Sequence, residues 1–158
     1  MNKHAGEELA RACAESMYSR DAAARELGVK IEFAGPGQSR VTMPVKVHML
    51  NGHAVCHGGF IFALADTAFA YACNSRNSVN LAQSCSIDFV SPAREGEVLT
   101  ATAEQQHQLS RTGLYDVTVT RPDGQVVARF RGRSYRVRGT ILPPDEARNG
   151  DIGSGDRI

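Results

Sequence analysis

One apolar stretch with a single acidic residue inside it constrains this chain more than any other feature. From Cys56 to Ser75 the sequence reads C-H-G-G-F-I-F-A-L-A-D-T-A-F-A-Y-A-C-N-S. A helix that is apolar on every side is typical of a protein core, so we expect residues 60–73 to form a buried helix. Asp66 is the only charged residue of the stretch. Because an ionised carboxylate is costly to bury without a partner, Asp66 is either a structural hydrogen-bond acceptor or a catalytic group.

Two glycines at the predicted start of this helix favour the catalytic interpretation. Gly58 and Gly59 leave the first backbone N–H groups uncovered, and the N-terminus of a helix attracts negative charge. An oxyanion that develops during a reaction would be stabilised at such a place.

Length and composition narrow the class of protein. A chain of 158 residues is one domain of ordinary size with a sizeable core. The net charge of +1 argues against a nucleic-acid-binding protein. The apolar run falls short of a membrane span of about 20 residues, and the first residues lack the apolar core of a signal peptide. The four cysteines have no C-x-x-C spacing, so we expect a cytoplasmic protein with reduced thiols.

The remaining patterns predict an α+β fold in which an antiparallel sheet wraps around the central helix. A helical pattern over 6–27 is interrupted at Asp21, which is expected to cap a second short helix that Gly28 ends. Pro44 is expected to mark an edge strand. Beyond Arg138 we expect a mostly disordered tail, residues 139–158, outside a domain of residues 1–138. The expected strands are 29–33, 39–47, 79–90, 97–109, 114–120 and 125–137.

Several segments together resemble a known family. The segment N-G-H-A-V-C-H-G-G-F-I-F-A-L-A-D-T-A at 51–68 is similar to the hotdog-fold acyl-CoA thioesterases of the phenylacetate-degradation type. The segments F-V-S-P-A-R-E-G-E-V-L from Phe89 and G-L-Y-D-V-T-V from Gly113 match the family too, and the resemblance spans roughly residues 8–138. It implies a hotdog fold and a homotetramer built as a dimer of dimers. It also implies hydrolysis of aryl-acetyl-CoA, such as phenylacetyl- or hydroxyphenylacetyl-CoA, without a cofactor.

Both Asp66 and the glycines at the start of the predicted helix would have a role in thioester hydrolysis. Asp66 would attack the carbonyl or deprotonate water, and the Gly58 N–H would stabilise the oxyanion. The two residues are eight positions apart, which is about 12 Å along a helix. Both must lie within about 3 Å of the reacting centre. If the helix starts near Gly58, a site shared between two chains about a two-fold axis satisfies both demands.

Three more polar residues match positions that act near the thioester in this family. Asn51 and His57 would hold the thioester and shape the oxyanion pocket, although Asn51-Gly52 is also a common turn whose side chain orders the loop. Ser84 would position water near the carboxylate. Strand alternation places Ser84 with Asn80, opposite Leu81, so it would point away from its own helix and toward a partner chain.

Two residues are expected to bind the substrate, one at the CoA nucleotide and one in the acyl pocket. Arg111, in the turn S-R-T-G, is expected to touch the CoA nucleotide, because arginine suits phosphates. Phe60 is expected in the acyl pocket together with Leu64 and Phe69, for which core packing is an equal explanation. Five further arginines lie along the last predicted strand or directly after it, and for most of them a solvated face is the simpler interpretation. Their alternation changes side near Ser134, which predicts a bulge. The five are Arg129, Arg131, Arg133, Arg136 and Arg138.

Four alternative interpretations of these residues have weaker support. A zinc site of His48, His53, Cys56 and His57 matches no strong metal spacing, so no metal is expected. A nucleophilic Cys56–His57 pair is disfavoured because neighbouring residues of an extended loop point to opposite sides. A hotdog dehydratase would act on hydroxyacyl thioesters by proton transfer. A non-catalytic acyl-CoA-binding protein would have no use for Asp66 beside a bare H-G-G turn.

Overall fold

The computed structural model describes residues 2–144 as one sheet with helices packed against it. The helical segments are α1 (Lys3–Arg20), α2 (Ala22–Glu26), the single 3₁₀ turn η1 (Val47–Met49) and α3 (Gly58–Cys73). The strands are β1 (Lys30–Gly35), β2 (Gln38–Pro44), β3 (Asn80–Phe89), β4 (Val98–Gln108), β5 (Thr112–Thr120) and β6 (Val126–Arg136).

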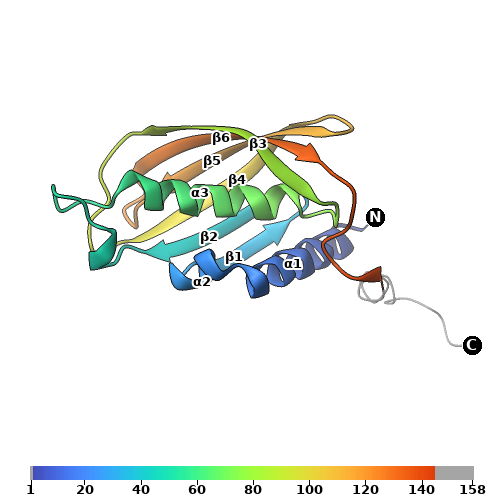
Figure 1. Ribbon diagram of the computed structural model, residues 1–158, viewed down its shortest axis with the longest axis horizontal. Coiled ribbons are helices and arrows are strands. Elements are labelled where there is room, and N and C mark those ends of the chain that lie inside the picture. The colour runs from blue at the N-terminus through green and yellow to red at the C-terminus, as the bar shows by residue number, and fades with distance from the viewer. Residues whose placement is uncertain (1, 145–158) are drawn as a thin grey trace, which may run out of the picture.

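The sheet is antiparallel and curves around α3. Its six strands follow the order β1-β2-β4-β5-β6-β3, so β1 and β3 form its two edges. Figure 1 shows α3 lying along the inner side of the curved sheet, with α1 and α2 beside β1. The predicted α+β architecture, a sheet wrapped around a long central helix, is confirmed.

The N-terminal helices break where the sequence predicts. The Asp21 side chain accepts a hydrogen bond from the Ala24 N–H at 2.9 Å and so caps α2. Gly28 follows α2 with a φ of +73°, a left-handed conformation that favours glycine and ends the helix.

The core lies between α3 and the inner face of the sheet. Leu64 and Phe69 of α3 are buried, and Phe69 packs edge-on against Tyr115 with ring centroids 5.6 Å apart. Gly132 allows this approach, because a Cβ on it would lie 2.9 Å from the Phe69 ring. Truncating a large buried side chain of this kind costs about 3–5 kcal/mol of stability, so this contact fixes α3 against the sheet.

The predicted edge position of Pro44 is wrong. β2 lies between β1 and β4, and Pro44 is the last residue of the strand, opposite Val98. A strand end accommodates proline for the same reason as an edge does, because the missing N–H breaks no interior ladder bond.

The predicted bulge near Ser134 lies in the neighbouring strand instead. The register between β3 and β6 shifts between Ala82 and Ser84 of β3, opposite Ser134 and Arg133. Gln83 is therefore the extra residue. The bulge reverses the alternation of β3, so Leu81 is 56% exposed although the simple pattern had placed it on the inner side.

The first residues of the predicted tail pack on the domain. Leu142 is buried, and its N–H donates to the Asn77 Oδ1 at 2.8 Å. Gly139 accepts a hydrogen bond from the Val79 N–H. The rest of the tail, residues 145–158, lies outside the described residues, so its predicted disorder stays a prediction. No helix within residues 2–144 is both long and apolar enough to cross a membrane.

Candidate active site

Asp66 lies half-buried on α3, without a partner among the residues that the structure describes. Its carboxylate accepts no hydrogen bond and forms no ion pair within residues 2–144. Burial raises the pKa of Asp66 above its usual value, and the nearby negative charge of Asp21 adds to this. An acidic group that is partly desolvated and unpaired is typical of functional sites, so the structural-acceptor interpretation of Asp66 loses its main support.

The start of α3 offers a free amide. The helix begins at Gly58, as predicted, and the His57 side chain caps it by accepting the Gly59 N–H at its Nδ1, 3.3 Å away. This contact uses Nδ1 as an acceptor, so Nε2 is the ring nitrogen left for another partner. The Gly58 N–H has no acceptor among the described residues. A helix N-terminus with an unsatisfied donor is suited to a developing negative charge.

A shallow groove opens in front of the Gly58 amide. Its volume is about 430 Å³, and Gly58, Ile61, Phe89 and Val90 are among the residues that line it. Phe89 and Val90 are 54% and 60% exposed, which is unusual for apolar side chains of this size. A Cβ on Gly58 would lie 2.8 Å from the Phe89 Cζ. Glycine therefore keeps the groove open at the amide.

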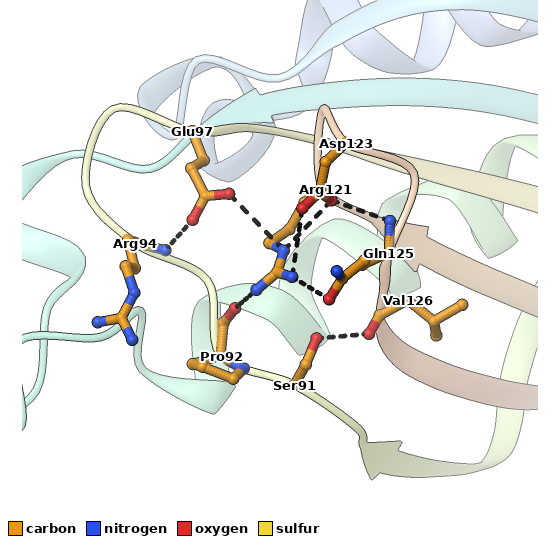
Figure 2. A network of polar contacts seen from close by, with 8 residues as sticks. All are labelled: Ser91, Pro92, Arg94, Glu97, Arg121, Asp123, Gln125 and Val126. Atoms are coloured by element: carbon orange, nitrogen blue, oxygen red, sulfur yellow. Dashed lines mark hydrogen bonds and ion pairs between the residues drawn. The ribbon is translucent and has the colours of Figure 1, made fainter.

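A polar network holds the far wall of this groove. Arg121, at the end of β5, donates to the Pro92 carbonyl at 3.1 Å and pairs with Asp123 at 3.4 Å (Figure 2). Its guanidinium also bonds the Gln125 side chain. Ser91 donates to the Val126 carbonyl at 2.6 Å. Because Ser91 and Pro92 line the groove, the network fixes the groove wall to the β5–β6 hairpin.

The two candidate groups cannot meet within one chain. Gly58 and Asp66 lie on the same regular helix, so their eight-residue separation amounts to about 12 Å along its axis. A single reacting carbon cannot contact both of them.

Asn51 organises the loop before α3. Its Oδ1 accepts hydrogen bonds from the His53 N–H at 2.9 Å and the Val55 N–H at 3.4 Å. Its own N–H donates to the Val55 carbonyl. These contacts fit the loop-ordering interpretation of Asn51, and they use the side-chain oxygen while leaving the Nδ2 donors without a partner among the described residues.

The structure does not bring Ser84 to Asp66. Ser84 is exposed and pairs across the ladder with Arg133 on the outer face of the sheet. Cys85 points the other way, since it lies opposite Gly132, against which Phe69 of α3 packs. The charge of Asp66 raises the pKa of Cys85 in addition to the effect of burial. Cys85 is thus a β3 residue on the same side of the sheet as α3, and the sequence pattern did not single it out.

The predicted acyl-pocket residues have different surroundings. Leu64 and Phe69 belong to the closed core. Phe60 is half-buried and meets the His48 ring edge-on, with centroids 6.0 Å apart. Ile61, its neighbour on α3, lines the groove instead. The adjacent apolar residues Phe89 and Val90 could have indicated the groove, because successive side chains of a strand point to opposite sides and one of the two must face outward.

The predicted arginines separate into two groups. Arg129, Arg131 and Arg133 are exposed on one face of β6, and Arg131 forms a bidentate pair with Asp116 at 2.7 and 2.9 Å. This pair lowers the pKa of Asp116. Arg111 lies elsewhere, in a hollow beside the end of β6 that Arg136 and Arg138 also line.

The histidines and cysteines form no metal-binding arrangement in the part of the chain that the structure describes. Residues 2–144 contain no group of three or more His, Cys, Asp or Glu side chains placed to hold an ion. All four cysteines are free thiols. Burial raises the pKa of Cys56 to about 11, so this thiol is protonated at neutral pH and is a poor nucleophile.

Comparison with known proteins decides the family. The profile of the Thioesterase superfamily matches residues 53–128. The chain is 50% identical over 128 residues to the acyl-coenzyme A thioesterase PaaI of Escherichia coli K12, covering 81% of this chain and 91% of that protein. The chain belongs to the thioesterase superfamily. This confirms the resemblance to the phenylacetate-degradation type and identifies the chain as a thioester hydrolase.

Solved structures agree with this assignment. The E. coli PaaI protein from the phenylacetic acid degradation operon matches with a TM-score of 0.85 and 47% identity, over 85% of this chain and 98% of that one. The protein smu.793 of Streptococcus mutans, bound to acetyl CoA, matches with a TM-score of 0.68 and 26% identity, over 71% and 90% of the two chains. The hotdog fold is thereby confirmed.

Proposed function

We propose that this enzyme hydrolyses aryl-acetyl-CoA thioesters, such as phenylacetyl- or hydroxyphenylacetyl-CoA, in two equivalent sites of a two-fold dimer. One observation carries the proposal. Within residues 2–144 the Asp66 carboxylate has no partner and the Gly58 amide has no acceptor, and the two lie on the same helix, too far apart to act in one chain. The relative named as an acyl-coenzyme A thioesterase supports the reaction type, and the operon named for the E. coli structure supports the acyl group.

A dimer brings the two groups together. If two copies of α3 pack antiparallel with the two-fold axis near Phe62, midway between positions 58 and 66, each Gly58 lies opposite the partner's Asp66. Phe62 and Asp66 belong to the side of α3 that the sheet leaves half-exposed. Small side chains on this side, including Ala63 and Ala70, would allow a second helix to approach closely.

The edge strand β3 supports the same arrangement. Among the strands of the described residues it pairs with β6 alone, so one row of its N–H and C=O groups is open to a further strand. The large apolar residues Leu81, Phe89 and Val90 at its two ends are 54–60% exposed. Pairing of β3 with its copy would extend the sheet across the dimer and cover these side chains. A further pairing of dimers into a tetramer remains a prediction.

The reaction then follows from the residues of two chains. The thioester carbonyl oxygen would accept the Gly58 N–H at the start of α3, and we assign the His57 ring and the Asn51 Nδ2 group as further donors to it. Asp66 of the partner subunit would take a proton from water, whose oxygen adds to the carbonyl carbon. The C–S bond breaks, the carboxylic acid is released, and the proton passes to the CoA thiolate. Direct attack by Asp66 would give an anhydride that water then opens.

Thiol release from phenylacetyl-CoA tests the proposal. We expect rapid liberation of CoA, slower hydrolysis of straight-chain acyl-CoA, and no release by Asp66→Asn. A dehydratase would release no thiol but would convert a 3-hydroxyacyl thioester. A binding protein would do neither, although CoA would still raise its melting temperature. A single turnover in ¹⁸O-water separates the two routes. An anhydride that water opens at the Asp66 carbonyl leaves ¹⁸O in Asp66 and none in the released acid, whereas base catalysis places ¹⁸O in the released acid alone.

A further inference from the structure

The break between α1 and α2 packs against the central helix and carries a second carboxylate. Asp21 is the residue between the two helices, and its Oδ1 accepts the Ala24 N–H at 2.9 Å. Its other oxygen, Oδ2, accepts a hydrogen bond from the Tyr71 hydroxyl of α3 at 3.5 Å. One carboxylate thus bonds two helices, and one of these is the helix that carries Asp66.

The surroundings hold this carboxylate in place. Tyr71 is 1% exposed, so the core encloses its ring. Burial raises the pKa of Tyr71 well above its usual value, and the charge of Asp21 raises it further, so the hydroxyl stays protonated and donates. The Tyr18 hydroxyl, near the end of α1, donates to the Val29 carbonyl at 2.8 Å. This bond joins the chain before Asp21 to the chain after α2 and fixes the segment between them.

Helix geometry directs Tyr71 toward the level of Asp66. Tyr71 follows Asp66 by five residues, which is about 7.5 Å along the axis of α3. Side chains of a helix lean back toward its N-terminus. The Tyr71 hydroxyl, and the Asp21 carboxylate bonded to it, therefore lie on the Asp66 side of the Tyr71 backbone. The charge of Asp21 acts at this range, because it is the second cause, after burial, of the raised pKa of Asp66.

The other described groups that face α3 are neutral. The buried side chains of β1, β2, β4 and β6 are apolar or hydroxyl groups, and β5 adds Tyr115, whose pKa burial raises to about 12. The thiols of Cys73 on α3 and Cys85 on β3 lie within reach of the charge of Asp66. Burial raises both of their pKa values, that of Cys73 to about 12, so both thiols stay protonated. Asp21 is therefore the charged neighbour of Asp66 among the described residues.

We propose that Asp21 acts in the hydrolysis through Asp66, as a fixed negative charge that makes the Asp66 carboxylate a stronger base. The inference rests on the proposed thioesterase function. A like charge nearby disfavours the ionised form of a carboxyl group, so Asp66 binds a proton more tightly beside Asp21 than it would alone. A carboxylate with a higher proton affinity takes a proton from water more readily at neutral pH. Asp21 is thus a positioning residue, since it acts on the reaction through Asp66.

The variant Asp21→Asn removes the charge and keeps the cap, because asparagine caps helices about as well as aspartate does. We expect the acid limb of kcat/KM for phenylacetyl-CoA to move to lower pH. At the midpoint pH of the wild-type limb, the variant should then keep more than half of its own plateau rate. Its plateau at neutral pH should be lower than that of wild type, because the base is weaker. High salt should bring the two limbs closer together, since it screens the charge of Asp21.

Two further variants test the geometry. Tyr71→Phe keeps the charge of Asp21 but removes the hydroxyl that bonds it to α3, so its acid limb should lie between those of wild type and Asp21→Asn. Asp88→Asn removes an exposed carboxylate of β3 and is the matched control, whose limb should coincide with that of wild type. An acid limb of Asp21→Asn at the wild-type pH would overturn the assignment, because a purely structural cap would leave the limb in place.

A stability measurement keeps the test independent of catalysis. Asp66→Asn should raise Tm at pH 7, and it should do so by less in the Asp21→Asn background, where the repulsion is already absent. Equal gains in Tm in the two backgrounds would show that the carboxylates do not interact and would also overturn the assignment. Hydrolysis that persists in Asp66→Asn would instead contradict the proposed function, and the two gains in Tm would still decide whether Asp21 acts on Asp66.

Discussion

At the scale of single residues, the chemistry depends on Asp66 being both unpaired and partly buried. Its pKa is raised, first by burial and then by the charge of Asp21. A raised pKa means that the folded state binds this proton more tightly than the unfolded state does. The ionised form that catalysis requires therefore lowers the stability of the folded chain near neutral pH.

Asp66→Asn should consequently stabilise the protein while it abolishes hydrolysis. We expect a gain of up to about 1 kcal/mol at pH 7, or roughly 2–4 °C in Tm, kept small because the carboxylate is half-exposed to solvent. The gain should shrink as the pH falls through the raised pKa of Asp66, since the wild-type group then becomes neutral too. Thermal unfolding of both proteins between pH 4 and 8 checks this, with the exposed Asp88→Asn as control. A loss of stability at pH 7 would mean that Asp66 has a stabilising partner.

The same titration predicts the pH dependence of activity. The protonated carboxyl group of Asp66 can neither accept a proton nor attack, so kcat/KM should fall as the pH drops through its raised pKa. The usual pKa of an aspartate is about 4. We expect the midpoint of the acid limb at a higher pH than this, because the pKa of Asp66 is raised. Initial rates on phenylacetyl-CoA across the pH range measure it. An acid limb below the usual pKa of aspartate would assign the titration to another group.

Substitutions of Gly58 separate the amide from the space that it leaves. Gly58→Ala keeps the N–H but adds a Cβ that meets the exposed Phe89 ring, which can move. Gly58→Pro removes the N–H and suits the first position of a helix. We expect kcat to fall by about 10²–10³-fold in the proline variant, as for other oxyanion donors, and far less in the alanine variant. Equal losses in kcat would show that only the space matters.

At the scale of elements, the loop 91–97 carries one wall of the groove and depends on Arg121. This side chain is 14% exposed and bonds the Pro92 carbonyl and the Asp123 carboxylate. Arg121→Ala should cost about 1–3 kcal/mol of stability, because it leaves these acceptors unsatisfied, and should raise the KM for phenylacetyl-CoA. Urea unfolding and initial rates measure the two effects. Arg94→Ala is the control, since only its backbone joins the network (Figure 2). An unchanged urea midpoint would remove Arg121 from this role.

Most of the helices and strands could be predicted from the sequence. The start of α3 at Gly58, the break at Asp21 and the six strands follow from glycine, capping and alternation signals. The bulge at Gln83 could not be predicted, because polar and small residues surround it and either register keeps a plausible pattern. The Pro44 error has a similar origin, since a strand end and a sheet edge tolerate proline equally. The orientation of Ser84 was also ambiguous, because Ser84 directly follows the bulge and its side of the strand depends on the register.

At the scale of the whole molecule, the open edge of β3 is the feature that a single chain leaves unexplained. The sequence could not locate it, because strand order is set by pairing between distant segments. The groove at Gly58 lies where β3 ends, so the same edge that is open for pairing also borders the candidate site. Assembly and catalysis therefore depend on the same surface.

Charges placed on this edge should separate the dimer and stop the reaction together. Leu81→Glu combined with Val90→Glu alters side chains that are 56% and 60% exposed in the single chain, so the fold of each chain should persist. We expect a monomer in sedimentation velocity, an unchanged circular dichroism spectrum and at least a hundredfold loss of kcat/KM. Val98→Glu, which alters a 46% exposed residue on β4, should keep both the assembly and the activity. A fully active monomer would contradict the shared site.

The most direct measurement is complementation between two inactive variants. Asp66→Asn and Gly58→Pro chains, co-expressed with different tags and purified through both, form dimers with one site that carries both changes and one that carries neither. The shared site predicts about half of the wild-type rate per dimer for this mixed species, and almost none for either variant alone. Mixed dimers as inactive as their parents would contradict the account, because each chain would then need its own Asp66 and its own Gly58.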